Sequence, residues 1–439
     1  MKAIRMLPSS VRFAYRMDIM DAKLFKFFAA NWCPGQNIRG ETNIWRLHFA
    51  PMVEYEGVQS AILSLAAIYL WDYVDDPSEV IGRRWITRYG MAEDRLKHLL
   101  NKEGPTDAET RELITTASIL SIQDITFTER RHKPTNKPRW LTRFEQCEPF
   151  IKSLCGLPWW KTIDRHLPSL HISQIVVVGR GIILPQLMRR LPSDLDLEKE
   201  TARFHWLLCG SEESVYEIHG GCGFSRMLLH YISQITFCAA WLHKKPESTV
   251  FFDVAKYLLR MLVEMKQWSS EHSSWEASKT LPQPIEWIRS TNQGYIVNTA
   301  RAMTEATAEA WRIAAIIYLR CRVFGQFRSE DLEGNLSDLA HCIRIMPTSG
   351  YLFTSQAPLL PAFLLTMLGT RKHRIIAQAW FEGVSTTPVR SNVRPLYQTL
   401  IGIRSWICTI YHPKKQKRKW WERLVERLNN DEVEMLCLI

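Results

Sequence analysis

The stretch AEAWRIAAIIYLRCRVFG, residues 308–325, decides the fold class of this 439-residue chain. Its apolar residues repeat at i, i+3, i+4, i+7 and i+8, the period of one face of an α-helix. That face carries Trp311, Ala314, Ala315, Tyr318 and Leu319, and a second apolar face carries Ile313, Ile316 and Ile317. A helix that is apolar on most sides is expected to be buried on most sides. The stretch therefore predicts a core helix.

Short helices joined by tight turns are predicted after this core helix. The breaker cluster PTSG, residues 347–350, precedes an apolar run that ends at Leu368. Pro361 suits the first turn of that helix, because the N–H that proline lacks has no helical partner there. Further helices are predicted over 375–384 and 393–410, with the breaker STTP between them.

The N-terminal part is also predicted to be helical, over about residues 22–124. Its clearest element has an apolar stripe from Val58 to Tyr69 and stops at the sequence DDP, residues 75–77. The β-branched run at 175–178 is closely followed by Pro185, which does not favour a strand. We therefore predict an all-α fold, a large multi-helix domain of stacked, antiparallel short helices.

Six segments of the chain carry a family resemblance. They are the stretch at 308–325, CIRIMPTSGYLFTSQAPLLPAFLLTMLGT at 342–370, AWFEGVSTTPVRSNVRPLYQTLIGIRSW at 379–406, and earlier segments at 169–187, 206–242 and 265–271. Together they resemble the fungal-specific transcription factor domain (second type), the regulatory region of Zn2Cys6 zinc-cluster transcription factors. The resemblance is specific over about residues 150–408 and weaker before that. It implies an all-helical regulatory domain of a nuclear protein, with no catalytic residues.

The cysteines do not form the zinc cluster of such factors. They stand singly, without a C-x-x-C pair, at positions 33, 147, 155, 209, 222, 238, 321, 342, 408 and 437. A zinc site of this type needs ligands brought together on a tight turn, so this spacing argues against a local finger or cluster, and nothing in the sequence requires coordination from distant parts of the fold. Most of the cysteines are predicted to be small buried core residues. We therefore expect DNA contact only indirectly, or through a zinc cluster missing from the N-terminus.

The net charge of +11 is concentrated in two basic clusters. One is a loop with Arg130, Arg131, Lys133, Lys137 and Arg139, and the other is the run Lys414, Lys415, Lys417, Arg418 and Lys419. The clusters hold ten of the eleven net charges, so the rest of the chain carries about +1. A protein that binds nucleic acid through its fold is expected to have a broad basic face. The second cluster is instead interpreted as a nuclear-import signal, and its alternative is a solvated helix start.

The domain organisation is predicted as one regulatory domain over residues 1–410, followed by a basic and then amphipathic tail over 411–439. Hinges are expected near 129–139, 191–200 and 275–284, where breakers or charges gather. The N-terminus lacks the features of a secretory signal. The longest apolar runs are interrupted by polar residues, so no membrane span is predicted.

Two glycine-rich motifs invite a nucleotide-binding interpretation that the sequence does not support. VVVGRG, residues 176–181, begins like a dinucleotide fingerprint, but Leu184 stands at the third glycine position and the alternating strands are missing. GGCGFS, residues 220–225, has no lysine to neutralise a phosphate, as a P-loop requires. We interpret the second motif as a turn in which Ser225 caps the next helix.

An acidic motif supports the strongest enzymatic alternative, an all-α Mg²⁺-dependent prenyl-diphosphate enzyme. Asp72, Asp75 and Asp76 have the spacing of one helix face, and carboxylates of that kind bind magnesium. The second motif that such enzymes need is matched only loosely at residues 330–338, and Pro77 makes the first a helix-ending turn. Neither a hydrolase elbow nor a catalytic triad is evident. We expect no enzyme, with no catalytic, cofactor-binding or metal residues.

The resulting hypothesis is a nuclear transcriptional regulator that acts through a helical effector- or partner-binding domain and lacks its own zinc-cluster module. Its expected partners are another protein or a second copy of the chain, with a small-molecule effector as a further candidate. Such an effector pocket would be lined by tryptophans such as Trp159, Trp160, Trp206, Trp268 and Trp311, although helix packing is their commoner use. The alternative is a non-DNA-binding interaction module or co-regulator.

Overall fold

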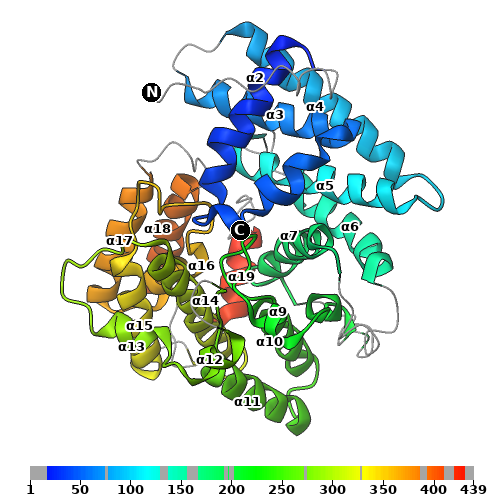
Figure 1. Ribbon diagram of the computed structural model, residues 1–439. Coiled ribbons are helices and arrows are strands. Elements are labelled where there is room, and N and C mark those ends of the chain that lie inside the picture. Colours follow the sequence, from blue (N-terminus) through cyan, green and yellow to red (C-terminus); the bar gives the residue numbers. More distant parts are fainter. Residues whose placement is uncertain are drawn as a thin grey trace.

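The computed structural model describes residues 17–74, 78–128, 137–155, 167–191, 196, 202–270, 274–326, 329–385, 393–409 and 420–430. Within these ranges the all-α prediction is confirmed, and the β contacts are two isolated bridges, Glu217–Trp268 and Ile218–Ser225. Figure 1 shows short helices packed side by side, with the N-terminal helices at one end of the molecule.

The N-terminal end is built around a buried helix, α3. Its helices are α2 (Ile19–Phe27), α3 (Glu56–Tyr73), α4 (Glu79–Leu100), α5 (Asp107–Gln123) and α6 (Arg139–Cys155). The predicted apolar stripe of α3 is buried, and the helix packs against α2, α4 and α5. α5 begins with a capping box, in which the Thr106 side chain accepts from the Glu109 N–H and the Glu109 carboxylate accepts from the Thr106 N–H.

The middle section places both glycine-rich motifs in structural roles. Its helices are α7 (Ser169–Gln186), α9 (Glu212–Tyr216), α10 (Arg226–Lys244), α11 (Thr249–Glu264), α12 (Trp275–Thr280) and α13 (Pro284–Arg289). The β-branched run 175–178 lies inside α7. Ser225 caps α10, as predicted, because its side chain accepts from the Leu228 N–H. A Cβ on Gly220 would lie 1.9 Å from the Thr42 carbonyl oxygen, so only glycine fits that turn.

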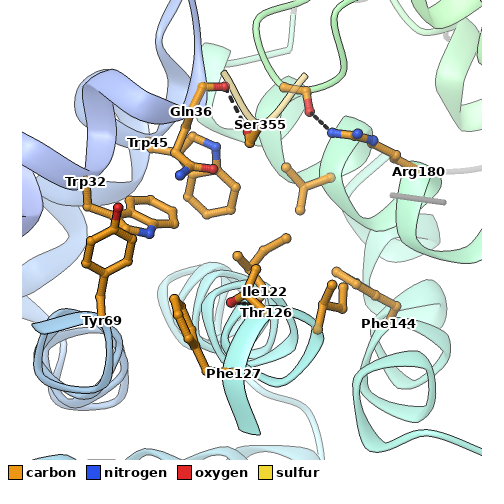
Figure 2. A pocket seen from close by; sticks show the side chains of 13 residues that line it. Trp32, Gln36, Trp45, Tyr69, Ile122, Thr126, Phe127, Phe144, Arg180 and Ser355 are labelled. Carbon is orange, nitrogen blue, oxygen red and sulfur yellow. Dashed lines mark hydrogen bonds between the residues drawn. The ribbon is translucent and has the colours of Figure 1, made fainter. Parts of the chain in front are cut away.

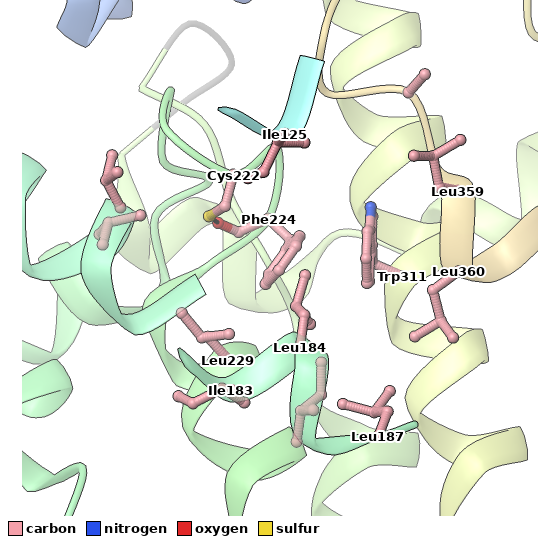
Figure 3. Packing of buried hydrophobic residues seen from close by; sticks show 14 of the residues in the cluster. Ile125, Ile183, Leu184, Leu187, Cys222, Phe224, Leu229, Trp311, Leu359 and Leu360 are labelled. Carbon is pink, nitrogen blue, oxygen red and sulfur yellow. Dashed lines mark hydrogen bonds between the residues drawn. The ribbon is translucent and has the colours of Figure 1, made fainter. Parts of the chain in front are cut away.

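The predicted core helix is α14. The C-terminal helices are α14 (Ala300–Arg322), α15 (Ser329–Ile345), α16 (Leu359–Leu368), α17 (Arg371–Ser385), α18 (Val393–Thr409) and α19 (Trp420–Asn430). α14 contacts α10, α11, α13, α15, α16 and α19. Trp311 is fully buried, with its ring 4.7 Å from that of Phe224 and with Leu359 and Leu360 beside it (Figure 3). The predicted core helix is thus confirmed.

The final helix, α19, packs into this core. The Trp421 indole N–H donates to the Leu187 carbonyl at 2.8 Å, and the Trp421 ring lies 5.0 Å from that of Tyr318. The fully buried Arg322 donates to Glu422 at 3.0 Å and to backbone carbonyls at the C-terminal end of α7. Apolar contacts and a buried cation therefore join α19 to both α7 and α14.

Of the three predicted hinges, the structure describes only the third in full. Most of the first two, 129–136, 192–195 and 197–200, lies outside the described residues. The third, 275–284, contains the short helix α12, whose first residue, Trp275, is buried. The division into one domain and a tail stays a prediction, although the described part of that tail is the packed helix α19.

Candidate functional site

A cavity opens between the N-terminal helices and α7 (Figure 2). Its enclosed free volume is small, about 60 Å³, and the empty space around its walls is about 790 Å³ when open solvent is counted. The lining residues are mostly apolar or aromatic: Trp32, Gln36, Trp45, Tyr69, Ile122, Ile125, Thr126, Phe127, Phe144, Val177, Arg180, Gly221 and Ser355. Small-molecule sites typically combine such walls with a few polar groups. We refer to this space as the aromatic cavity.

Three π-helical turns contribute to the walls of the aromatic cavity. They are η1 (Phe28–Trp32), η4 (Trp45–Phe49) and η6 (Asp124–Thr128), and no other π-helix occurs in the described ranges. The cavity is lined by Trp32 from η1, by Trp45 from η4, and by residues 125–127 from η6. π-Helical turns are rare and are frequent at functional sites, because the widened turn re-aims side chains at some cost in stability. Their convergence marks this cavity as the candidate site.

The aromatic wall is held by edge-to-face contacts. The Trp32 and Trp45 rings meet at 87° with centroids 5.3 Å apart, and the Tyr69 and Phe127 rings meet at 77° with centroids 5.7 Å apart. This geometry is favourable for aromatic quadrupoles and fixes ring orientation. Burial raises the pKa of Tyr69 to about 12, so its phenol is neutral at physiological pH. The wall therefore offers flat apolar faces and one hydroxyl.

The opposite end of the aromatic cavity is polar. Arg180, on α7, is 7% exposed and donates from Nη1 to the Gly221 carbonyl at 3.2 Å. The Ser355 hydroxyl donates to the Gln36 carbonyl at 3.1 Å, which joins the loop before α16 to the N-terminal end. Arg180 is the only charged side chain among the lining residues. A ligand here would meet aromatic faces at one end and a guanidinium at the other.

Gly181, beside Arg180, is needed for helix packing. This explains a glycine of the VVVGRG motif without nucleotide binding. A Cβ on Gly181 would lie 2.3 Å from Cδ2 of Phe144, a residue of α6. The glycine therefore lets α6 approach α7 closely, and Phe144 then lines the cavity. Because the motif lies within a helix, it does not form a phosphate-binding turn.

Buried charge anchors the π-helical turn η6. Its first residue, Asp124, is fully buried, pairs with Arg143 on α6 and accepts from the Tyr89 hydroxyl at 2.9 Å. Arg143 also pairs with Glu93 on α4. Paired, hydrogen-bonded charges of this kind fix one geometry, because breaking a pair leaves an uncompensated buried charge. η6 is thus tied to both α4 and α6.

The tryptophans that line the aromatic cavity are not the ones that the sequence suggested. Trp206 and Trp311 are buried in helix packing, Trp268 is buried and lines a separate small cavity beside α12 and α13, and Trp159 and Trp160 lie outside the described residues. Sequence reasoning missed Trp32 and Trp45. The signal that would have found them is the aromatic density of residues 27–49.

Other sites considered from the sequence are placed as follows. The side chains of eight cysteines can be placed and all are buried, which confirms the prediction for Cys33, Cys147, Cys155, Cys209, Cys222, Cys238, Cys321 and Cys342. Asp72 lies near the end of α3, residues 75–77 are not described, and the acidic segment 330–338 lies inside α15. In the described part of the chain, no three His, Cys, Asp or Glu side chains gather as a metal site would require.

The structure does not describe the predicted import signal. Lys414, Lys415, Lys417, Arg418 and Lys419 lie outside the described residues, between α18 and α19. Among the helices that are described, none has the length and apolar character needed to cross a membrane.

Comparison with known proteins assigns the family. The model of the fungal specific transcription factor domain matches residues 23–402. The chain belongs to this family. The fungal transcription factor domain thus extends to the N-terminal helices, where the sequence resemblance was weak, and includes every residue that lines the aromatic cavity. Comparisons with curated proteins and with solved structures gave no match. Membership gives the chain a role in transcriptional regulation.

Proposed function

We propose that this chain is a nuclear transcriptional regulator whose helical domain responds to a small effector in the aromatic cavity. Family membership supports the regulatory role. The observation that carries the effector site is the convergence of η1, η4 and η6 on one cavity with aromatic walls and a buried guanidinium. The effector class that suits these walls is a flat, largely apolar molecule with a hydrogen-bond acceptor or an acidic group for Arg180.

The proposed mechanism is a population shift between two arrangements of the domain. The cavity is lined by residues of the N-terminal end, of α7 and of the loop before α16, so a bound effector would contact all three. A ligand shifts an equilibrium only by its differential affinity for the two states. The π-helical turns give the domain a second local conformation. A change from π-helical to α-helical hydrogen bonding would turn the side chains of these segments in a new direction. The altered domain surface would then change partner binding.

We infer that the domain acts without base contacts of its own and without catalysis. Outside the two basic clusters the chain carries a net charge of only about +1. A broad basic face that could neutralise the phosphates of DNA is therefore not expected. Contact with DNA is therefore assigned to a partner or to a zinc-cluster module. An electrophoretic mobility-shift assay on the purified chain tests this point: tight, sequence-specific binding at moderate salt would contradict it.

A cavity-filling variant tests the effector site. Ile122→Trp places a bulky ring in the aromatic cavity. The matched control is Ile375→Trp, at a 59% exposed position on α17. Each chain is fused to a heterologous DNA-binding module that drives a reporter gene. We expect Ile122→Trp to change reporter output and to abolish an organic ligand detected by native mass spectrometry, with Ile375→Trp unchanged. Equal output and equal ligand retention in all three chains would overturn the proposal.

A further inference from the structure

α11 presents an apolar stripe to solvent. Of the eighteen exposed large hydrophobic side chains in the described ranges, Val250, Val254 and Tyr257 follow one stripe of this helix, and Phe252 and Val263 lie on it outside the stripe. Figure 1 shows α11 at the lower edge of the molecule, where it packs on α10 and α14 through its other side. Soluble proteins rarely leave a continuous apolar surface uncovered unless it binds a partner.

The spacing of the stripe is that of a coiled-coil seam. Val250, Val254, Tyr257 and Met261 are separated by four, three and four residues, the d-a-d-a pattern of a heptad. The first three are 66%, 39% and 52% exposed, and Met261 is partly buried against the core. A second helix laid along this seam would cover all four side chains.

The charges beside the seam identify a second copy of the chain as its partner. Asp253 and Arg260 occupy the two g positions on the solvent side of the stripe and carry opposite charges. In an antiparallel pair the g positions of the two helices face each other, so Asp253 meets Arg260 of the other copy. Symmetry then forms the reciprocal pair, as an isologous two-fold interface requires.

A parallel pair does not have this complementarity. It would place the g residues against the e positions, which are Phe251 and Leu258. Leu258 is buried and Phe251 is partly buried against the body of the molecule, so neither offers a charge to Asp253 or Arg260. In the monomer Asp253 is paired with Lys256 at 3.0 Å, and Arg260 lies over the Tyr257 ring at 5.2 Å. Both charged groups are therefore already positioned on the open side of the helix.

We propose that α11 is a homodimer interface, in which the Val250, Val254, Tyr257 and Met261 seams of two chains pair antiparallel. A helix of 16 residues is about 24 Å long, and a pair of that length buries less than the roughly 800 Å² per partner of a standard interface. The dimer is therefore reversible, with a dissociation constant in the micromolar range. This inference is independent of the effector cavity.

Sedimentation velocity of the full chain from about 1 µM to about 100 µM tests the interface. We expect a monomer–dimer equilibrium whose dissociation constant rises about tenfold for Asp253→Arg and for Arg260→Asp, because each change creates two like-charge contacts. The double exchange, Asp253→Arg with Arg260→Asp, restores the wild-type constant. Val263→Ser, an exposed apolar position off the seam, is the matched control and leaves the constant unchanged.

Three results would overturn this assignment. The first is a monomer at every concentration, which would leave the seam to a different protein. The second is a dimer that is insensitive to both single charge changes, which would place the interface elsewhere. The third is a double exchange that fails to restore the dimer while the circular-dichroism spectrum stays native, which would exclude the antiparallel pair.

Discussion

Arg322 and Glu422, one hundred residues apart in sequence, form an ion pair at 3.0 Å that joins the core helix α14 to the final helix α19. Arg322 also donates to the carbonyls of Gln186, Leu187 and Arg189, which follow or end α7. Carbonyls at a helix end have no intrahelical partner. The guanidinium of Arg322, on α14, thus donates to the carbonyls at the end of α7 and pairs with Glu422 on α19.

Replacement of Arg322 is expected to be strongly destabilising. Arg322→Met removes the guanidinium that pairs with Glu422 and donates to the carbonyls at the end of α7, although Leu187 keeps its bond from Trp421. Loss of one partner of a buried ion pair costs about 3–5 kcal/mol. The free energy of unfolding, measured by urea denaturation, should fall by that amount. Glu426→Gln, at an exposed position on α19, is the control and should change stability by less than about 0.5 kcal/mol. Equal midpoints for the two variants would contradict the assigned role of Arg322.

The contact between Gly181 and Phe144 gives a second prediction. Gly181→Ala forces an atom into a 2.3 Å approach, so we expect a loss of about 1–3 kcal/mol in the free energy of unfolding. Gly334→Ala is the matched control, because Gly334 lies in α15 with no atom near its Cβ position. That change should raise stability by about 0.5–1 kcal/mol through helix propensity. If both substitutions shift the midpoint in the same direction, the packing role of Gly181 is wrong.

The buried His230 and the partly buried His219 predict a loss of stability in mild acid. Burial, with smaller contributions from Arg226 and His205 respectively, lowers the pKa of His219 to about 3 and of His230 to about 3. In the unfolded chain each ring takes up a proton near its ordinary pKa of 6.5. As pH falls below about 6.5 the unfolded state binds more protons, so stability falls by about 1.4 kcal/mol per pH unit for each histidine until the folded pKa is reached.

The pH effect can be measured by urea denaturation between about pH 7.5 and about pH 5. His230→Gln removes the contribution of that ring, so the stability of the variant should decline less steeply than that of the wild type. The His219 contribution persists, since its Nδ1 accepts from the Gly221 N–H at 3.0 Å in the neutral form. A midpoint that does not change over this range would mean that neither ring is held neutral by burial.

The basic run between α18 and α19 gives a prediction about localisation. Replacement of Lys414, Lys415, Lys417, Arg418 and Lys419 by alanine should lower the nuclear fraction of a fluorescent fusion, because import receptors recognise short basic clusters. Lys244 and Lys245, an exposed basic pair at the C-terminal end of α10, provide the control when changed to alanine. An unchanged nuclear fraction in the first variant would reject the run as the import signal.

The helical architecture could be predicted from the sequence because burial on a helix leaves a local period. The residues around Trp311 have that period, and Pro361 and Ser225 mark helix starts through rules that depend only on neighbouring residues. The segment 275–284 shows the limit of these rules. Its prolines and polar residues are typical of a linker, and the structure adds that Trp275 is buried and that residues Trp275–Thr280 form the short helix α12. The hinge itself stays a prediction.

The aromatic cavity could not be predicted in the same way. Its walls come from elements that are far apart in sequence, such as Trp32, Phe127 and Arg180, and no spacing rule connects them. A π-helical turn is also set by the packing around it: Asp124 is held by Arg143 on another helix, an interaction that local sequence does not encode. Arg180 lies between two glycines whose pattern is typical of nucleotide binding, which directs attention away from its place in the cavity wall.

The position of α19 has a consequence for how the protein is made. Trp421 is among the largest fully or almost fully buried side chains, and it covers surfaces of α7 and α14 that are synthesised much earlier. The core is therefore incomplete on the ribosome until α19 has emerged, since domains fold as units once their sequence is available. A product truncated before residue 420 would expose the Leu187 and Tyr318 surfaces and become a substrate for quality-control proteases.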